Sequence, residues 1–162
     1  MSKIIISGAA GFIGYHLSKH LLQLGHDVYA IDNLSYGIEH RMEELKSNTR
    51  FHFYKMDVSE LDKQELPACD IFIHLASEKL PRYSSGWETL ERNSKSFDAA
   101  LAYCIRQDAR LLFASTSDVY GLNPELPFTE TSACVLGSSL NKRWAYAGSK
   151  LHNELRLAAA GR

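Results

Sequence analysis

A short apolar run that leads directly into a glycine-rich turn constrains this fold most strongly. Lys3 to Ser7 is typical of a buried strand, and Gly8-Ala9-Ala10-Gly11-Phe12-Ile13-Gly14 follows it at once. Such glycines permit a tight turn, a close approach of phosphate to the backbone, and close packing of helix on strand. The N–H groups and dipole of the following helix attract a pyrophosphate. The pattern predicts a dinucleotide-binding turn; the alternative is a glycine-rich turn that binds no ligand.

Short apolar runs alternate with amphipathic stretches along the chain, as in a parallel sheet with crossover helices. The predicted strands are Lys3 to Ser7, Asp27 to Ile31, Arg50 to Tyr54, Asp70 to Leu75 and Arg110 to Ala114. The predicted helices are Phe12 to Leu24, Ile38 to Lys46, Trp87 to Gln107, and one that begins near Leu140 or Tyr146. Right-handed crossovers then predict a Rossmann-like, doubly wound α/β sheet in the order 3-2-1-4-5. Without a linker or repeat, residues 1–162 are expected to form one domain.

Two of these helices carry an apolar stripe at helical spacing, which predicts the face that each turns toward the sheet. The expected inner face of the first helix consists of Ile13, Leu17, Leu21 and Leu24. The expected inner face of the long helix consists of Leu90, Phe97, Leu101 and Cys104.

Composition excludes several classes of partner. Lys plus Arg number 18 and Asp plus Glu 19, a net charge of −1 that gives no overall attraction to nucleic acid or anionic membranes. No apolar stretch is long enough to span a membrane, and the N-terminus lacks the pattern of a signal peptide. Three cysteines without a CxxC pair favour a reducing compartment. The seven histidines lack metal-ligand spacing. We therefore expect a cytoplasmic protein with no metal, nucleic-acid or membrane partner.

The second predicted strand is followed by Asp32, where a dinucleotide-binding sheet places an acid against the adenosine ribose. A carboxylate there accepts hydrogen bonds from the ribose hydroxyls and repels a 2′-phosphate, which favours NAD over NADP. The alternative is a turn or helix-capping role, because Asp32 and Asn33 also suit a turn. Asp57 and Val58, after the third strand, are candidates to lie near the adenine.

Hydroxyl side chains follow the fifth predicted strand, at Ser115, Thr116 and Ser117, and parallel sheets bind ligands beyond the carboxyl ends of their strands. Further along, Tyr146 and Lys150 stand four residues apart, on one face of a helix. The Lys150 ammonium would stabilise tyrosinate and lower the pKa of Tyr146 from about 10 toward that of a general base. The tyrosine could then deprotonate a substrate hydroxyl while hydride leaves to nicotinamide. The alternative is an exposed Tyr/Lys helix face.

Taken together, these motifs resemble the extended short-chain dehydrogenase/reductases, specifically their NAD-dependent nucleotide-sugar epimerase and dehydratase family. The matching segments, in family order, are GAAGFIG at 8–14, DNLSYG at 32–37, DV at 57–58, HLAS at 74–77, STSDVYG at 115–121 and YAGSK at 146–150. STSDVYG and HLAS are closest to UDP-glucuronate decarboxylases, and UDP-sugar 4-epimerases are the other close branch. Ser117-Asp118 stands where dehydratases carry Asp-Glu, which weakens a dehydratase assignment.

The resemblance implies a role for each matching residue. Thr116, Tyr146 and Lys150 would be catalytic. The implied NAD-binding residues are Gly8, Gly11, Phe12, Ile13, Gly14, Asp32, Asn33, Ser35, Gly37, Asp57, Val58, Leu75, Ala76, Ser77, Lys79, Asn93, Tyr146 and Lys150. For Asn93 a structural role bonded to backbone is an equal alternative. His74 is expected to be a packed, hydrogen-bonded residue.

The resemblance also implies an activity. The expected enzyme, an isomerase or lyase of carbohydrate metabolism, oxidises a nucleotide sugar at C4 with NAD, epimerises or decarboxylates the keto sugar, and returns the hydride. The alternatives are an NAD(P)-dependent sugar dehydrogenase or reductase that releases reduced cofactor, and a non-catalytic NAD-binding regulatory domain. The family normally continues for about as long again, into C-terminal strands and a substrate domain, and its full-length form is implied to be a homodimer. The 162 residues are therefore expected to hold the cofactor site and catalytic residues but to be incomplete for turnover.

Overall fold

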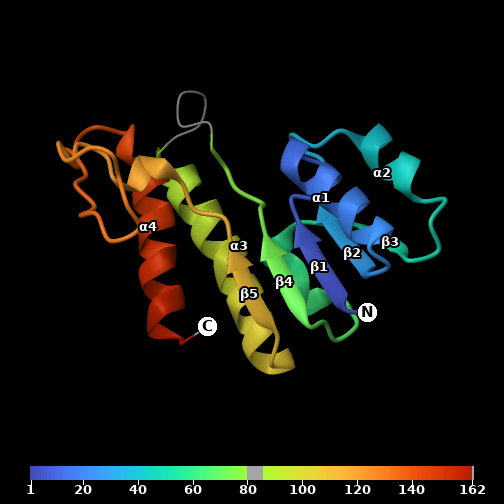
Figure 1. The fold of residues 1–162 in the computed structure, drawn as a ribbon. Coiled ribbons are helices and arrows are strands. Elements are labelled where there is room, and N and C mark those ends of the chain that lie inside the picture. Colours follow the sequence, from blue (N-terminus) through green and yellow to red (C-terminus); the bar gives the residue numbers. More distant parts are fainter. Residues whose placement is uncertain (80–85, 162) are drawn as a thin grey trace. The chain divides into compact units, whose positions relative to one another are not determined.

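A computed structural model of the chain describes residues 1–79 and 86–161 (Figure 1). Its strands are β1 (Lys3–Ser7), β2 (Asp27–Asp32), β3 (Phe51–Lys55), β4 (Ile71–His74) and β5 (Arg110–Phe113). Its α-helices are α1 (Phe12–Gln23), α2 (Glu39–Leu45), α3 (Gly86–Gln107) and α4 (Trp144–Ala159), with short 3₁₀ helices η1 (Val58–Lys63) and η2 (Ser117–Val119). The predicted elements are therefore present, with ends displaced by at most one residue, and the last helix begins at Trp144.

The residue contacts separate the chain into two compact units, which are described one at a time. The sheet unit consists of Met1–Ser77 and Lys95–Ala114, and contains all five strands. The second unit consists of Glu78–Ser94 and the segment from Ser115 onward, and contains η2 and α4. The helix α3 contributes residues to both units.

All five strands run parallel in the order β3-β2-β1-β4-β5, which confirms the predicted Rossmann-like sheet. In the centre, Ile5 of β1 stands opposite Tyr29 of β2 and Phe72 of β4. Because parallel neighbours need crossover connections, this order brings the carboxyl ends of β1, β2 and β4 to one edge of the sheet. Among the predicted cofactor residues, Gly8, Asp32 and Leu75 lie at this end of the sheet.

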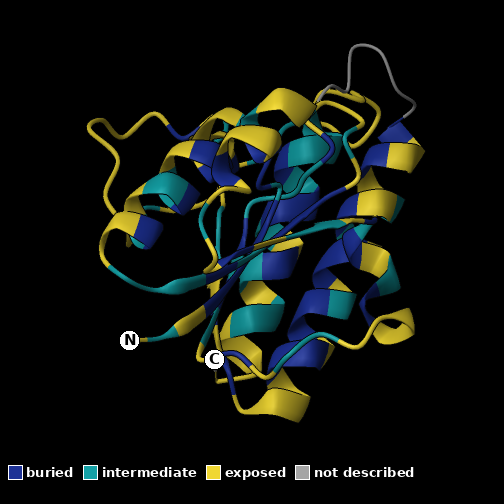
Figure 2. Cartoon of the chain, turned by 90° about the vertical axis from the view of Figure 1, so that its right-hand side faces the viewer, coloured by how far each residue is buried: buried dark blue, intermediate teal, exposed yellow. Residues whose placement is uncertain are grey.

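Apolar side chains cover both faces of the sheet, as expected when helices pack on each side. Ile4 and Ile6 belong to a core cluster with Tyr15 and Leu22 of α1 and Met42 of α2. Alternation along the strands places Ile5 and Phe72 on the opposite face, and the ring of Phe72 lies 5.9 Å from that of Tyr103 in α3. Figure 2 shows buried residues along the strands and exposed residues on the outer sides of the helices.

The buried face of α1 differs from the prediction. Ile13 and Leu24 are 66% and 61% exposed, whereas Gly14, Tyr15, Ser18 and Leu22 are buried. Leu17 and Leu21 are partly buried against the core. The reason is close approach to the turn after β1, since a Cβ on Gly14 would lie only 2.6 Å from the Ala9 Cα. The small residues Gly14 and Ser18 therefore occupy inward positions beside this turn, and Ile13 lies outward.

At the start of α3 the buried face also differs from the prediction, because polar residues are buried there. Leu90, predicted to face inward, is 40% exposed, and the buried positions of that turn are taken by Thr89 and Asn93. Further along the helix, Phe97, Leu101 and Cys104 are buried as predicted.

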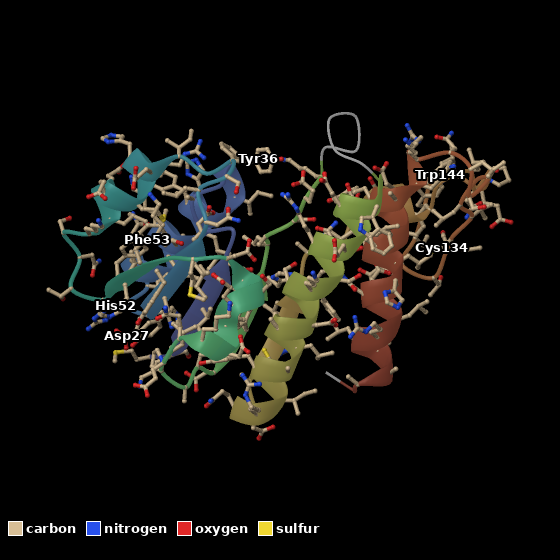
Figure 3. The ribbon with its side chains drawn as sticks, turned by 180° about the vertical axis from the view of Figure 1, so that it is seen from behind. Asp27, Tyr36, His52, Phe53, Cys134 and Trp144 are labelled. Atoms are coloured by element: carbon tan, nitrogen blue, oxygen red, sulfur yellow. The ribbon has the colours of Figure 1, made fainter. Side chains whose placement is uncertain are left out.

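In the second unit, a long loop joins η2 to α4. The Leu122 N–H donates to the Val135 carbonyl at 2.7 Å, which closes the loop on itself. Its end packs under the indole of Trp144, because a Cβ on Gly137 would lie 2.8 Å from the Trp144 Cε2. Figure 3 labels Cys134 of this loop and Trp144 at the start of α4. No helix within residues 1–79 and 86–161 is long and apolar enough to cross a membrane.

Candidate active site

The predicted phosphate turn folds as a cradle without side chains. Gly8 has a φ of +72°, and a Cβ there would lie 2.7 Å from the backbone nitrogen of Ala76. The Gly11 N–H donates to the Gly8 carbonyl at 3.2 Å, and α1 begins at the next residue with no side-chain cap on its N-terminus. The first N–H groups of a helix have no partner within the helix, and a phosphate is a suitable acceptor for them. Phe12 and Ile13 are exposed at the same place.

Asp32 ties the end of β2 to this turn. The side chain is 8% exposed, and its carboxylate accepts from the Ala10 N–H at 2.9 Å and from the Leu34 N–H at 2.8 Å. Gly37 leaves room for it, since a Cβ at that position would lie 2.7 Å from Asp32 Oδ1. The turn role considered for Asp32 is therefore present. It is compatible with the predicted ribose role, because each carboxylate oxygen can accept more than one hydrogen bond.

Arg41 is a neighbour of the turn that the sequence did not single out. Its guanidinium donates to the Ala10 carbonyl at 3.1 Å, and the Ile38 N–H donates to the same oxygen at 3.1 Å. The Ala10 N–H donates to Asp32, and the Ala10 carbonyl accepts from Arg41 and Ile38. Both polar groups of the Ala10 backbone are therefore bonded to residues between the end of β2 and α2. The only sequence signal for Arg41 was its place in a short charged helix.

The predicted adenine-side residues meet at the ends of β2 and β3. The Asn33 amide donates to the Asp57 carboxylate at 2.8 Å, and the Ser35 N–H donates to Asn33 Oδ1 at 2.9 Å. The other oxygen of Asp57 accepts from the Ser59 N–H and so caps η1, and Val58 is buried beneath it. These contacts bring the four residues together. The roles of Asn33 and Ser35 toward the adenosine ribose, and of Asp57 and Val58 toward the adenine, stay predictions.

The residues after β4 lie beside the glycine turn. The Leu75 N–H donates to the Ser7 carbonyl at 3.1 Å, and Ala76 is the residue against which Gly8 packs. His74 is 1% exposed, its Nδ1 lies 2.7 Å from the Ser7 hydroxyl, and its ring stacks on that of Phe113. His74 is therefore a packed, hydrogen-bonded residue, as predicted. Ser77 follows half-buried in the same unit, and Lys79, in the second unit, is exposed.

In the second unit, Thr116 caps η2 with its side chain. Its Oγ1 accepts from the Asp118 N–H at 3.2 Å, and the residue is half-buried. A hydroxyl whose oxygen accepts in this way still has its own hydrogen to donate. The geometry therefore suits a hydrogen bond from Thr116 to a substrate oxygen.

Tyr146 and Lys150 share one face of α4, as their spacing predicted. The Lys150 Nζ lies 5.9 Å from the centre of the Tyr146 ring. Lys150 is 2% exposed, and burial lowers the pKa of its amine to about 8, while the charge of Glu154 acts in the opposite direction. Below that pKa the buried group is an ammonium, which is the form that stabilises a neighbouring tyrosinate. This arrangement is compatible with the predicted tyrosine base, and the catalytic roles of the two residues stay a prediction.

A cleft of about 420 Å³ opens beside Thr116. Its lining includes Ser115, Glu130 and Glu154, and the Ser115 hydroxyl donates a hydrogen bond to the Glu154 carboxylate. The cleft thus combines hydroxyl groups with two carboxylates, a lining suited to polyhydroxylated ligands. Ser115 was one of the hydroxyl residues noted after the fifth predicted strand, whereas Glu154 was not singled out by the sequence.

Asn93 has the structural role that was its alternative. Its amide accepts from the Glu78 N–H at 2.7 Å and donates to the Glu78 carbonyl at 3.1 Å. It also donates to the Ser149 hydroxyl at 2.9 Å, and the side chain is 3% exposed. Asn93 therefore joins the start of α3 to the turn of α4 that precedes Lys150. Its predicted contact with a cofactor stays a prediction.

The parallel sheet, the glycine turn with Asp32, and the helix that carries Tyr146 and Lys150 are the features of a dinucleotide-binding α/β protein. The sequence profile of the NAD dependent epimerase/dehydratase family matches residues 4–162, so the chain belongs to that family. An uncharacterised protein of Methanocaldococcus jannaschii is 34% identical over 94% of this chain and 49% of the relative.

Solved structures of enzymes are similar to the whole chain. The UDP-Glc/GlcNAc 4-epimerase of Campylobacter jejuni has a TM-score of 0.87 and 28% identity over 99% of this chain and 49% of its own. The UDP-glucose 4-epimerase of Stenotrophomonas maltophila, solved with bound NAD, has a TM-score of 0.84 and 25% identity over 100% of this chain and 50% of its own. The tunicamycin-biosynthesis enzyme TunA, an NAD-dependent NDP-hexosamine 5,6-dehydratase, has a TM-score of 0.81 and 30% identity over 100% of this chain and 50% of its own. The chain spans about half the length of these proteins.

Proposed function

We propose that this chain takes part in NAD-dependent modification of a nucleotide sugar through a transient 4-keto sugar, by epimerisation or decarboxylation. The observation that carries the proposal is the buried Lys150 beside Tyr146 on α4, in a chain of the epimerase/dehydratase family. The similarity to 4-epimerases that act on UDP-sugars supports the same reaction type. The epimerase and decarboxylase forms share the first oxidation, and product analysis separates them.

The residues present fit NAD. A tight turn, in which a Cβ on Gly8 or Gly14 would collide with neighbouring backbone, and a helix start without a side-chain cap suit a pyrophosphate. The Asp32 carboxylate suits ribose hydroxyls. When bound, NAD supplies the hydride acceptor and later the hydride donor. Gly8, Gly11 and Gly14 would hold its pyrophosphate, Asp32 and Asn33 the adenosine ribose, and Asp57 and Val58 the adenine.

Three side chains of the second unit would act on the sugar. Thr116 donates a hydrogen bond to the oxygen at C4 and orients it. Tyr146 accepts the proton of that hydroxyl as the C–H bond is broken, and returns it when the carbonyl is reduced. Lys150, protonated below its pKa of about 8, stabilises the tyrosinate between these two events.

Substitution of the base tests this assignment. Tyr146→Phe removes the proton acceptor and keeps the ring, so we expect turnover to fall by at least about 10²-fold. NAD binding, followed by calorimetry, should stay within about twofold, because the pyrophosphate and adenosine residues are unchanged. The matched control is Tyr29→Phe, whose ring stacks on His52 in the sheet unit, and it should keep wild-type turnover.

The assay uses the protein with NAD and a series of UDP-sugars, with products identified by NMR and NADH followed by absorbance. Altered sugar without accumulated NADH supports the proposal, and loss of carbon dioxide identifies decarboxylation. NADH formed in proportion to product would instead identify a dehydrogenase. Turnover that survives Tyr146→Phe contradicts the proposal.

A further inference from the structure

Glu154 lies one helical turn after Lys150 in α4, and two turns after Tyr146. Residues four apart share a helix face, so the three side chains form a single row. At the end of that row, the Glu154 carboxylate accepts a hydrogen bond from the Ser115 hydroxyl. Ser115 directly precedes Thr116, whose own hydroxyl caps η2. One carboxylate therefore connects the Thr116 segment to the helix that carries Tyr146 and Lys150.

We propose that Glu154 is a positioning residue, which holds the Ser115–Thr116 segment against α4 and supplies the negative charge that favours the ammonium form of Lys150. This inference rests on the proposed roles of Thr116, Tyr146 and Lys150. It adds a residue with a double function, because its hydrogen bond fixes one catalytic side chain and its charge acts on another.

The charge matters because Lys150 is almost completely buried. Burial favours the neutral amine and lowers its pKa to about 8, and Glu154 is the charged group that acts against this change. Tyr146 faces Lys150 from the same helix, and η2, which packs against α4, carries the exposed Asp118. If Glu154 lost its charge, Lys150 would release its proton closer to neutral pH, and less of the enzyme would hold the ammonium that stabilises tyrosinate.

The hydrogen bond with Ser115 keeps this charge in place. A glutamate side chain has several rotatable bonds, and a donor at its end restricts the carboxylate to one side of the helix. Glu154 is half-buried, so its carboxylate is only partly screened by water. We therefore expect Ser115 to influence Lys150 only through Glu154.

The test is an NMR titration of the 162-residue chain, with ¹³C-labelled lysine and no cofactor or substrate added. The Lys150 ¹³Cε signal, identified by its loss in Lys150→Met, reports the midpoint of the ammonium. In Glu154→Gln the midpoint should fall by about half a pH unit, because the amide keeps the shape but not the charge. The matched control is Glu130→Gln, which removes the other carboxylate of the same cleft and should leave the midpoint unchanged.

Ser115→Ala tests the tether and covers the case in which Glu154→Gln does not fold. Ser115→Ala should lower the Lys150 midpoint by about half as much as Glu154→Gln does. The Ser115→Ala/Glu154→Gln double variant should have the same midpoint as Glu154→Gln alone, because residues that act through one another have non-additive effects. Glu154→Asp keeps the charge and should retain a midpoint nearer the wild-type value. A midpoint that stays within about 0.1 unit in folded Glu154→Gln or in Ser115→Ala, or shifts that add in the double variant, overturns the inference.

The titration needs no turnover, so its outcome is independent of the proposed function. Turnover that survives Tyr146→Phe would defeat the proposed reaction and leave the Lys150 midpoints as measured. In an active enzyme, Glu154→Gln should also move the basic limb of the kcat/KM profile to lower pH by the same half unit. A role in folding alone would instead lower activity evenly across the pH range.

Discussion

A lysine that is only 2% exposed is costly to keep charged, and this cost lowers its pKa. Lys150 is held at that position by its place between two buried turns of α4, with Ser149 and Asn153 also buried. The same burial that brings its ammonium against Tyr146 lowers its pKa to about 8. The charged residue therefore reduces stability at neutral pH.

The lowered pKa of Lys150 predicts how the free energy of unfolding varies with pH. Between the folded pKa of about 8 and the ordinary value of 10.5, the unfolded chain binds more protons at Lys150 than the folded chain. Stability contributed by this group therefore rises as pH increases through that window, by about 3 kcal/mol in total. Lys150→Met keeps the apolar length and removes the titration.

The measurement is denaturant unfolding of both proteins from pH 7 to pH 10.5. The difference in free energy of unfolding should favour the methionine variant at pH 7 and decline steadily above pH 8. Other groups, such as the buried Cys69 thiol with its pKa raised to about 11, cancel in the comparison because both chains contain them. A difference that does not vary with pH would contradict the burial of a titrating amine.

At the scale of elements, close contact between α1 and the turn after β1 explains why Gly14 and Ser18 share the buried face of this helix with Tyr15 and Leu22. Gly14 and Ser18 are buried, and Ser18 donates to the Gly14 carbonyl at 2.7 Å. This packing brings the start of α1 to the edge of the sheet, where its free N–H groups are useful for binding an anion. The same glycine therefore serves both the packing and the predicted phosphate site.

Two glycine substitutions separate packing from helix propensity. In Gly14→Ala the new methyl would meet the Ala9 backbone at 2.6 Å, so we expect a loss of several kcal/mol of stability and of NAD binding. In Gly148→Ala the nearest atom is 3.9 Å away, an ordinary contact within α4. There we expect a gain of about 0.5–1 kcal/mol, since alanine is the better helix former. Thermal unfolding measures both, and equal effects of the two substitutions would refute the close contact.

Across the whole molecule, the parallel sheet is stabilised from both faces by residues far apart in sequence. On the α3 side, Phe97 is completely buried, and its ring lies 5.1 Å from that of Phe113 in β5. The chain of rings continues through His74, which stacks on Phe113 at the end of β4. The edge strand β5 is therefore attached to the sheet by aromatic packing as well as by hydrogen bonds.

Removal of this aromatic anchor should be costly. We expect Phe97→Ala to reduce the free energy of unfolding by about 3–5 kcal/mol, the usual cost of an excavated aromatic core position. Phe12→Ala is the matched control, because that ring is 70% exposed, and it should change stability by less than about 0.5 kcal/mol. Denaturant unfolding of the two variants decides the point, and similar losses would mean that Phe97 is not a core residue.

Local sequence patterns alone determined the order of the five strands, the glycine turn, and the Tyr146–Lys150 face. These features depend on residues close together in the chain, on strand and helix periodicity, and on the handedness of crossovers. For the same reason the family resemblance could be found from motifs spread along the chain.

The tertiary structure decided the features that depend on distant residues. It turned Ile13 and Leu24 outward, gave Asn93 its bonds to Glu78 and Ser149, and joined Ser115 to Glu154. Periodicity marks a helix face but does not reveal how closely a neighbouring backbone approaches it, nor which polar group satisfies a buried amide. The depth of burial of Lys150, and hence its lowered pKa, also arises only when α4 packs within its unit.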